Sequence, residues 1–161
     1  MQDIYRFLEK NKIDYQKFEH NAVFTCTDVL ELDKEMPGTG TKNLFLRDKS
    51  GSRHFLVTVG HDKNVDLGGL RQMIGVSKLS FASAERLEKY LGVKPGAVTL
   101  LGLINDTEHD IEVIVDKDIW GGPLQCHPLV NTASLVVDPM NLENFFKATG
   151  HNPKIIKIPA R

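Results

Sequence analysis

Residues 38–59 read GTGTKNLFLRDKSGSRHFLVTV and predict a hairpin at the centre of the fold. The apolar run at residues 44–46 indicates a strand with at least one face in the core, and residues 54–59 indicate a second strand. Turn residues at 48–51 join the two. Lys42 opens the first strand, where a buried ammonium group costs desolvation energy unless an anion meets it. Lys42 therefore either extends to solvent past the strand end or belongs to a site.

The rest of the chain mixes short helices and strands, without an internal repeat or a long linker. Helices are expected where a capping residue precedes an apolar pattern: after Asp3, after Thr25 or Thr27, after Asp66, after Ser83 and from Pro139. Further strands are expected at residues 15–19, 97–104, 111–116, 133–137 and 154–158. Hairpins combined with helices of two or three turns predict an α+β class with a mixed, curved sheet. A strictly alternating βαβ wound fold fits this pattern poorly.

Composition favours one globular domain spanning residues 1–161. Hydrophobic residues make up 41% of the chain and charged residues 25%, which is ordinary for a globular protein with a real core. The formal net charge is -1, so any contact with nucleic acid must be local. Charges near the N-terminus do not fit a signal peptide, and no apolar run approaches the roughly 18 residues that span a bilayer. Two widely separated cysteines favour a reduced, cytoplasmic setting.

Glycines at two positions suggest a place where a ligand could approach the backbone. Gly96 directly precedes the strand expected at 97–104 and Gly102 lies near its end, and glycine allows close approach while leaving amides free to donate. The plainer interpretation is that Pro95-Gly96 forms a turn after a helix.

The segment after residue 120 concentrates hydrogen-bonding groups. His127 is followed by a proline, and Asn131 and Thr132 come just beyond it, so the polar groups lie on a stiffened loop. His127 could act as a base, donate to a ligand or only orient the loop.

Several sharper motifs are excluded. The glycines before Lys42 do not form a phosphate-binding loop of the G-x-x-x-x-G-K-[ST] type, and no G-x-S-x-G elbow is present. No pair of histidines or cysteines has zinc spacing, so no metal site is expected. Asp116 and Asp118 could bind a cation, but a strand ending in a turn explains them more simply.

Four segments in this order resemble the YbaK/prolyl-tRNA synthetase-associated editing domain family, and most of all its free-standing prolyl-tRNA editing members. The segments that carry the resemblance are residues 40–46, 95–99, 102–106 and 127–132, followed by Gly150-His151. Order and spacing extend over nearly the whole chain. The resemblance implies a barrel-like curved sheet surrounded by helices, and hydrolysis of the ester that joins a wrong amino acid to tRNA, with alanyl-tRNA(Pro) as the expected substrate.

The resemblance also implies roles for particular residues. Lys42 matches a lysine central to activity, the loop from Gly96 lines the substrate site, and His127 belongs to the same pocket. The resemblance implies that no metal or other cofactor is needed, and that a terminal ribose hydroxyl helps to place or activate the attacking water. The expected partners are the acceptor end of tRNA(Pro) and prolyl-tRNA synthetase, with no membrane and no DNA.

The remaining site assignments follow from this implied chemistry. Amides near Gly96 and Gly102 are candidates to stabilise an oxyanion. The cation of Lys42 fits a phosphate or developing negative charge better than the substrate's ammonium group. The expected substrate-binding residues are Leu30, Asn43, Leu44, Thr99, Cys126, Asn131 and Thr132.

One departure from the family pattern leaves the substrate open. The family's loop often reads G-x-x-x-P, whereas Leu100 follows Gly96-Ala97-Val98-Thr99 here, which changes the rigidity of the loop. A deacylase for cysteine or serine on tRNA is one alternative. A module that binds an acceptor end or a synthetase without catalysis is the other.

Overall fold

The predicted hairpin forms the centre of the molecule. The computed structural model describes residues 3–19 and 36–161. Strands β2 (Thr41–Arg47) and β3 (His54–Gly60) pair antiparallel, with Thr41 opposite Gly60. In the turn, Asp48 Oδ1 accepts hydrogen bonds from three successive backbone amides, those of residues 51–53. A single carboxylate thereby satisfies the donors that the turn leaves unpaired.

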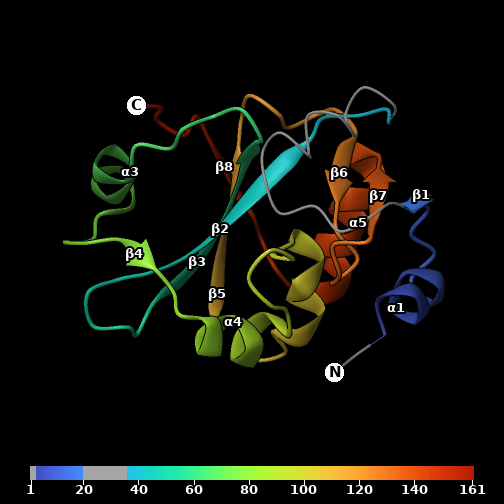
Figure 1. Ribbon diagram of the computed structural model, residues 1–161, viewed down its shortest axis with the longest axis horizontal. Helices are drawn as coiled ribbons and strands as arrows, with labels where there is room; N and C mark the ends of the chain where they lie inside the picture. The colour runs from blue at the N-terminus through green and yellow to red at the C-terminus, as the bar shows by residue number, and fades with distance from the viewer. Residues whose placement is uncertain (1–2, 20–35) are drawn as a thin grey trace.

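A five-stranded mixed sheet is built around this hairpin (Figure 1). Its order is β4-β2-β3-β5-β8, where β4 is Ser80–Phe81, β5 is Ile111–Asp116 and β8 is Lys154–Ile156. The pairs β2–β4 and β2–β3 are antiparallel, whereas β3–β5 and β5–β8 are parallel. The prediction of an α+β fold with a mixed sheet is confirmed.

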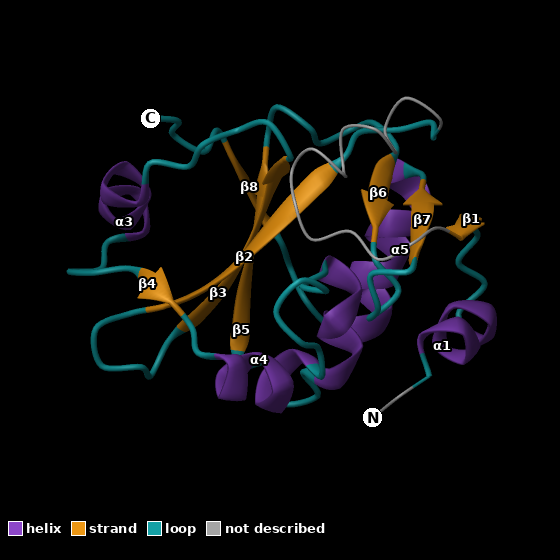
Figure 2. Cartoon of the chain, viewed as in Figure 1, coloured by secondary structure: helices purple, strands orange, loops and turns teal. Residues whose placement is uncertain are grey.

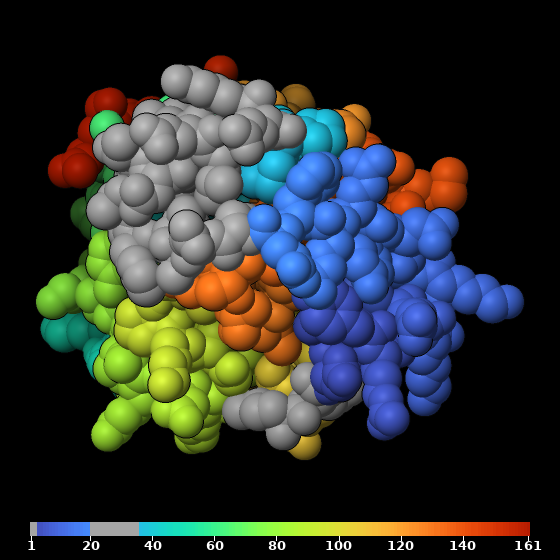
Figure 3. Space-filling model, turned by 45° about the vertical axis from the view of Figure 1, so that its right-hand side comes forward, coloured from blue at the N-terminus to red at the C-terminus, as the bar shows by residue number. Residues whose placement is uncertain are grey.

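A second, antiparallel sheet has the order β1-β7-β6. Strand β1 is Gln16–Glu19, β6 is Leu124–Cys126 and β7 is Ala133–Val137. Figure 3 shows the N-terminal segment and the β6–β7 region side by side at the surface, which agrees with the pairing of β1 and β7. The sheets meet where Thr39 forms a parallel bridge with Leu124. Barrel-like closure is not confirmed, because the described strands form two sheets with open edges.

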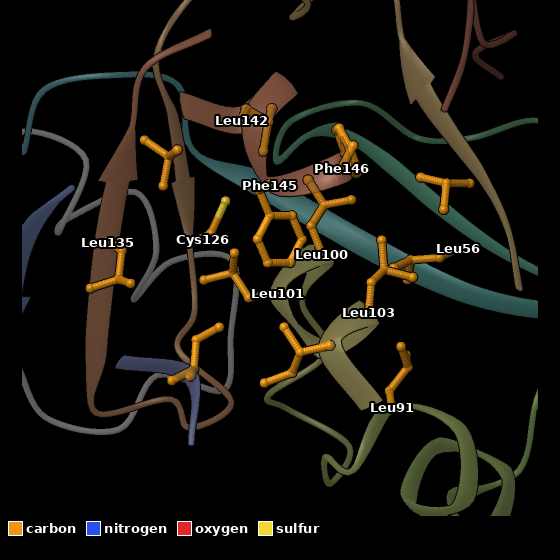
Figure 4. Close-up of a cluster of buried hydrophobic side chains, with 14 of the residues drawn as sticks. Leu56, Leu91, Leu100, Leu101, Leu103, Cys126, Leu135, Leu142, Phe145 and Phe146 are labelled. Carbon is orange, nitrogen blue, oxygen red and sulfur yellow. The ribbon is translucent and has the colours of Figure 1, made fainter. Parts of the chain in front are cut away.

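Two hydrophobic clusters lie on opposite faces of β2, because side chains alternate along a strand. Phe45 belongs to the larger cluster, and Leu46 to the smaller one. Figure 4 shows part of the larger cluster, where Leu101, Cys126 and Phe145 point toward one another. Side chains of neighbouring β2 residues therefore face different surroundings, which decides what each of them can contact.

Figure 2 shows the helices of the described chain. They are α1 (Ile4–Lys10), α3 (Leu67–Ile74), α4 (Ala84–Leu91) and α5 (Pro139–Thr149). Their ends agree with the sequence prediction. Gly75, Gly92 and Gly150 follow the last three, each with positive φ, a conformation that glycine adopts most easily. The helix expected after Thr25 or Thr27 lies outside the described residues. No helix in the described part of the chain is long and apolar enough to cross a membrane.

The strand expected at residues 97–104 is wrong. Residues Leu100–Asn105 form the 3₁₀-helix η1, and Thr99 caps it by accepting a hydrogen bond from the Leu101 amide at 3.2 Å. A short apolar run that is buried on all sides fits a strand or a buried helical turn equally well, so periodicity could not separate them. Gly102 lies inside η1, where a Cβ atom would be 3.1 Å from the Leu91 carbonyl oxygen.

Candidate functional site

Three of the predicted segments meet at the start of β2. The Thr41 hydroxyl donates to the Gln125 carbonyl oxygen at 2.6 Å, which joins β2 to the strand before His127. Asn43 Nδ2 donates to the Val98 carbonyl oxygen at 3.4 Å, which joins β2 to the loop after Gly96. Segments separated by 55 or more residues in sequence are thus held together by side-chain hydrogen bonds from one strand.

Asn43 and Lys42 leave β2 on opposite faces. Asn43 lies on the Phe45 side, where it also accepts a hydrogen bond from the Thr58 hydroxyl of β3. Lys42 and Leu44 line a cavity of about 470 Å³ on the other side, together with residues from the start of α3, Phe81 and Arg161. Neither His127 nor the 96–99 loop lines this cavity. Lys42 therefore lines a cavity on the face of β2 opposite to the one where Asn43 contacts the 96–99 loop.

Gly96 and Gly102 differ in what their backbones can offer. Gly96 is exposed in a loop and has a φ of 86°, which favours glycine. The Gly102 amide is buried and already donates to the Thr99 carbonyl oxygen at 3.1 Å. Thr99 is itself fully buried and occupied as the cap of η1. Of these three residues, only Gly96 lies where a ligand could approach.

His127 follows β6 directly and is half-buried. Its Nδ1 lies 3.2 Å from the Ala133 carbonyl oxygen. Because a carbonyl oxygen can only accept, this contact puts a proton on Nδ1 and orients the ring. Asn131 is half-buried and Thr132 is exposed on the same loop.

Cys126 lies in the core, and Leu30 falls outside the described residues. Burial raises the pKa of the Cys126 thiol to about 12. The thiol is neutral at physiological pH, so this cysteine cannot serve as a thiolate nucleophile. Packed among core side chains, it does not line the cavity beside Lys42.

Asp106 and His151 form a buried polar pair that the sequence did not predict. His151 Nε2 lies 2.8 Å from Asp106 Oδ2, and both side chains are 2% exposed. The amides of Asp110 and Ile111 also donate to the Asp106 carboxylate. The pair ties the end of η1 to the end of α5. The sequence signal was the histidine directly after the helix-ending Gly150.

Asp116 and Asp118 are paired with a lysine. Lys63 Nζ lies 2.6 Å from Asp116 Oδ2 and 3.1 Å from Asp118 Oδ2. This confirms the plainer interpretation, a strand end followed by a turn. No group of three or more potential metal ligands occurs among the described His, Cys, Asp and Glu residues.

The fold and the junction define an α+β domain in which loop segments far apart in sequence converge on one strand. A family model described as aminoacyl-tRNA editing domain matches residues 20–145. The chain is 40% identical over 152 residues to the prolyl-tRNA editing protein ProX of Acetoanaerobium sticklandii, covering 94% of this chain and 93% of the relative. It is 35% identical over 159 residues to prolyl-tRNA synthetase associated domain-containing protein 1 of Danio rerio, covering 97% and 86%.

The chain therefore belongs to the aminoacyl-tRNA editing domain family. A solved structure of a candidate trans-editing enzyme for prolyl-tRNA synthetase has a TM-score of 0.70 at 18% identity, covering 99% of both chains. At that identity the likeness concerns the fold alone.

Proposed function

We propose that the protein is a trans-editing deacylase that hydrolyses the ester of mischarged tRNA(Pro), with alanyl-tRNA(Pro) as its main substrate. The observation that carries the proposal is the junction at β2, where Thr41 and Asn43 hold the 96–99 loop and the strand before His127 together. Membership of the editing family and the 40% identity to a prolyl-tRNA editing protein support the same activity. Acylation by cysteine or serine is the alternative within this class.

The chemistry requires little beyond positioning. An aminoacyl ester is already activated, so a placed water and a stabilised oxyanion supply the needed reduction of the barrier. Amides of the exposed Gly96 loop are the proposed oxyanion donors, since the Gly102 amide is occupied. The ring of His127, oriented by Ala133, contributes a fixed hydrogen-bonding group. In this scheme no cofactor takes part.

Lys42 supplies the positive charge of the proposed site. It forms no ion pair with another described residue, so its charge remains for a ligand. A phosphate of the tRNA is its proposed partner, because the 96–99 loop that supplies the proposed oxyanion donors does not line the Lys42 cavity. The ammonium group of the substrate would be repelled.

Selection for alanine is proposed to rest on size. A small apolar pocket with Leu44 in its wall would admit alanine and exclude proline by steric clash. Contact alone discriminates by only about 1–3 kcal/mol for one methylene group, so exclusion is the more effective device. Asn131 and Thr132 are the proposed polar contacts, whereas Asn43 is proposed to position the 96–99 loop through its hydrogen bond to Val98.

The proposed partners are the acceptor end of tRNA(Pro) and prolyl-tRNA synthetase, in the cytoplasm, with residues 1–161 acting as one editing domain. A formal net charge of -1 favours a short contact over broad binding along the tRNA.

The test is deacylation of a panel of tRNAs carrying alanine, cysteine, serine or proline. Rapid hydrolysis of alanyl-tRNA(Pro) with sparing of prolyl-tRNA(Pro) is expected. Preferred hydrolysis of cysteinyl- or seryl-tRNA would replace the proposed substrate. Binding of tRNA without hydrolysis of any ester would establish the non-catalytic alternative.

A further inference from the structure

The cavity beside Lys42 is assembled from four separate parts of the chain. Phe81 pairs with Leu46 across β2 and β4, so its ring projects from the same sheet face as Leu44. The segment that holds Arg161 is fastened to residues 64–66. The Asp66 amide donates to the Pro159 carbonyl oxygen at 2.8 Å, and the Arg161 amide donates to the Asn64 carbonyl oxygen at 2.9 Å. The backbone thus places Arg161 at the cavity.

Three charged side chains line this cavity without neutralising one another. They are Lys42, Arg161 and Asp66, and none of them forms an ion pair with a described residue. Asp66 precedes α3, yet its carboxylate accepts no capping hydrogen bond from the helix. A Cβ atom at position 69 would lie 2.8 Å from Asp66 Oδ2, so Gly69 leaves room for the carboxylate. Two cations and one carboxylate remain for a ligand.

An aromatic ring completes the set. Phe81 is 62% exposed, one of the few large apolar side chains in the described chain that face solvent to this extent. An exposed ring at the edge of a charged cavity resembles the stacking surfaces that bind unpaired bases. The volume of about 470 Å³ lies within the usual range of about 300–1,000 Å³ for small-ligand sites.

We propose that this cavity is a ribonucleotide subsite that holds one unpaired nucleotide of the acceptor strand. The base stacks on Phe81, the cations of Lys42 and Arg161 contact phosphate, and Asp66 accepts a hydrogen bond from the ribose 2′-hydroxyl. The inference rests on the proposed function, since it assumes that the substrate is a tRNA. It adds Phe81, Asp66 and Arg161 as determinants of tRNA binding.

The first test measures the Kd for uncharged tRNA(Pro) and the KM for deacylation of alanyl-tRNA(Pro). Phe81→Ala is expected to raise both by about tenfold, the effect of losing one base–aromatic stack. Phe81→Trp keeps a stacking surface and is expected to retain binding. Met140→Ala is the matched control, because Met140 is 71% exposed on α5, away from the cavity. Unfolding midpoints establish that each variant is folded.

The second test separates the phosphate and ribose contacts. A short single-stranded RNA and its DNA counterpart serve as probes. Asp66→Asn is expected to bring the two Kd values closer together, because the 2′-hydroxyl contact is lost. Arg161→Ala is expected to reduce the slope of log Kd against log salt by about 0.7, the value for one phosphate contact on a single strand.

The outcomes distinguish this inference from the proposed function. If alanyl-tRNA(Pro) is hydrolysed and Phe81→Ala leaves Kd and KM unchanged, the subsite is refuted and the deacylase stands. If no ester is hydrolysed but Phe81→Ala weakens RNA binding and Phe81→Trp restores it, the subsite stands and the deacylase falls. Equal loss of binding in Phe81→Ala and Met140→Ala also refutes the subsite.

Discussion

Two half-buried lysines of the same sheet region have opposite surroundings. Lys63 is surrounded by acceptors, namely the carboxylates of Asp116 and Asp118 and the Ile158 carbonyl oxygen at 2.9 Å. Lys42 lines a cavity and forms no ion pair with a described residue. A lysine that serves the fold is neutralised by the chain itself. A lysine left without a partner at a cavity is available to a ligand, which is the physical basis for assigning Lys42 to the site.

The largest expected effect concerns the paired lysine. Lys63→Ala leaves the carboxylate of Asp116, which is 0% exposed, without its main counter-charge. The free energy of unfolding is expected to fall by about 3–5 kcal/mol, as for other broken buried pairs. Chemical denaturation measures this, with the neighbouring exposed Lys117→Ala as the control. A loss of less than about 1 kcal/mol, the range of an exposed pair, would show that Lys63 is not structural.

The unpaired lysine should behave in the opposite way. Lys42→Ala is expected to lower kcat/KM for alanyl-tRNA(Pro) about 10-fold to 100-fold, the effect of losing one charge-assisted hydrogen bond to a phosphate. Its free energy of unfolding should change by less than about 0.5 kcal/mol. The exposed Lys147→Ala on α5 controls for the loss of a charge. Undiminished hydrolysis by Lys42→Ala would contradict its role in the reaction.

The buried Asp106–His151 pair extends the comparison to pH. Burial raises the pKa of Asp106, but hydrogen bonds from His151 and from the amides of Ile111 and Asp110 outweigh this and hold that pKa below its ordinary value of 3.8. A carboxylate with a lowered pKa stabilises the fold above its unfolded pKa, about 3.9. That contribution is lost as pH falls through the folded pKa.

Asp106→Asn is therefore expected to lower the free energy of unfolding by about 1–3 kcal/mol at neutral pH. It should also flatten the decline of stability below about pH 4, where the unfolded carboxyl titrates. Urea unfolding at several pH values measures both effects. Asp110→Asn is the exposed control. If the free energy of unfolding of Asp106→Asn falls at acid pH as steeply as that of the unsubstituted protein, titration of Asp106 is not the cause of the fall.

A modest effect on stability is expected at the Gly96 loop. Gly96 has a φ of 86°, and a residue with a Cβ atom in this conformation costs about 1–2 kcal/mol. Gly96→Ala should lower the free energy of unfolding by that amount and lower kcat more than stability alone explains. Gly122→Ala is the control, since a Cβ atom there has nothing within 4 Å. Equal activity of the two variants would remove the Gly96 loop from the proposed chemistry.

Local signals in the sequence predicted most of the elements. The hairpin at 41–60, the helix from Ser83 to Gly92 and the helix from Pro139 to Gly150 all form as expected. Each depends on a turn, a cap or a periodicity contained within a few residues. The strand expected at 97–104 failed because its uniformly apolar composition carries no period. The short strands β4 and β6 were missed because the residues around them carry no longer apolar pattern, whereas the run at residues 154–158 indicated β8, which is equally short.

The candidate site was predictable in its segments but not in its geometry. Resemblance placed Lys42, the Gly96 loop and His127 in one site, and hydrogen bonds from Thr41 and Asn43 do join the neighbouring segments. The pattern could not foresee that Lys42 lies on the opposite face of β2 from Asn43. Nor could it foresee that Phe81 and Arg161 line the same cavity as Lys42.

By itself, the sequence determined where helices start and stop, the central hairpin and the likeness to an editing family, because all of these depend on residue types close together or in a fixed order. The tertiary structure alone decided which lysine is neutralised, which glycine amide is occupied and which charges share a cavity. Those outcomes depend on contacts between residues distant in the chain, such as Lys63 with Asp116 and Asp66 with Pro159. Which charged side chains pair depends on their distance in space, and the order of residues does not give that distance directly. The pairing in turn decides which charged groups can contact a ligand.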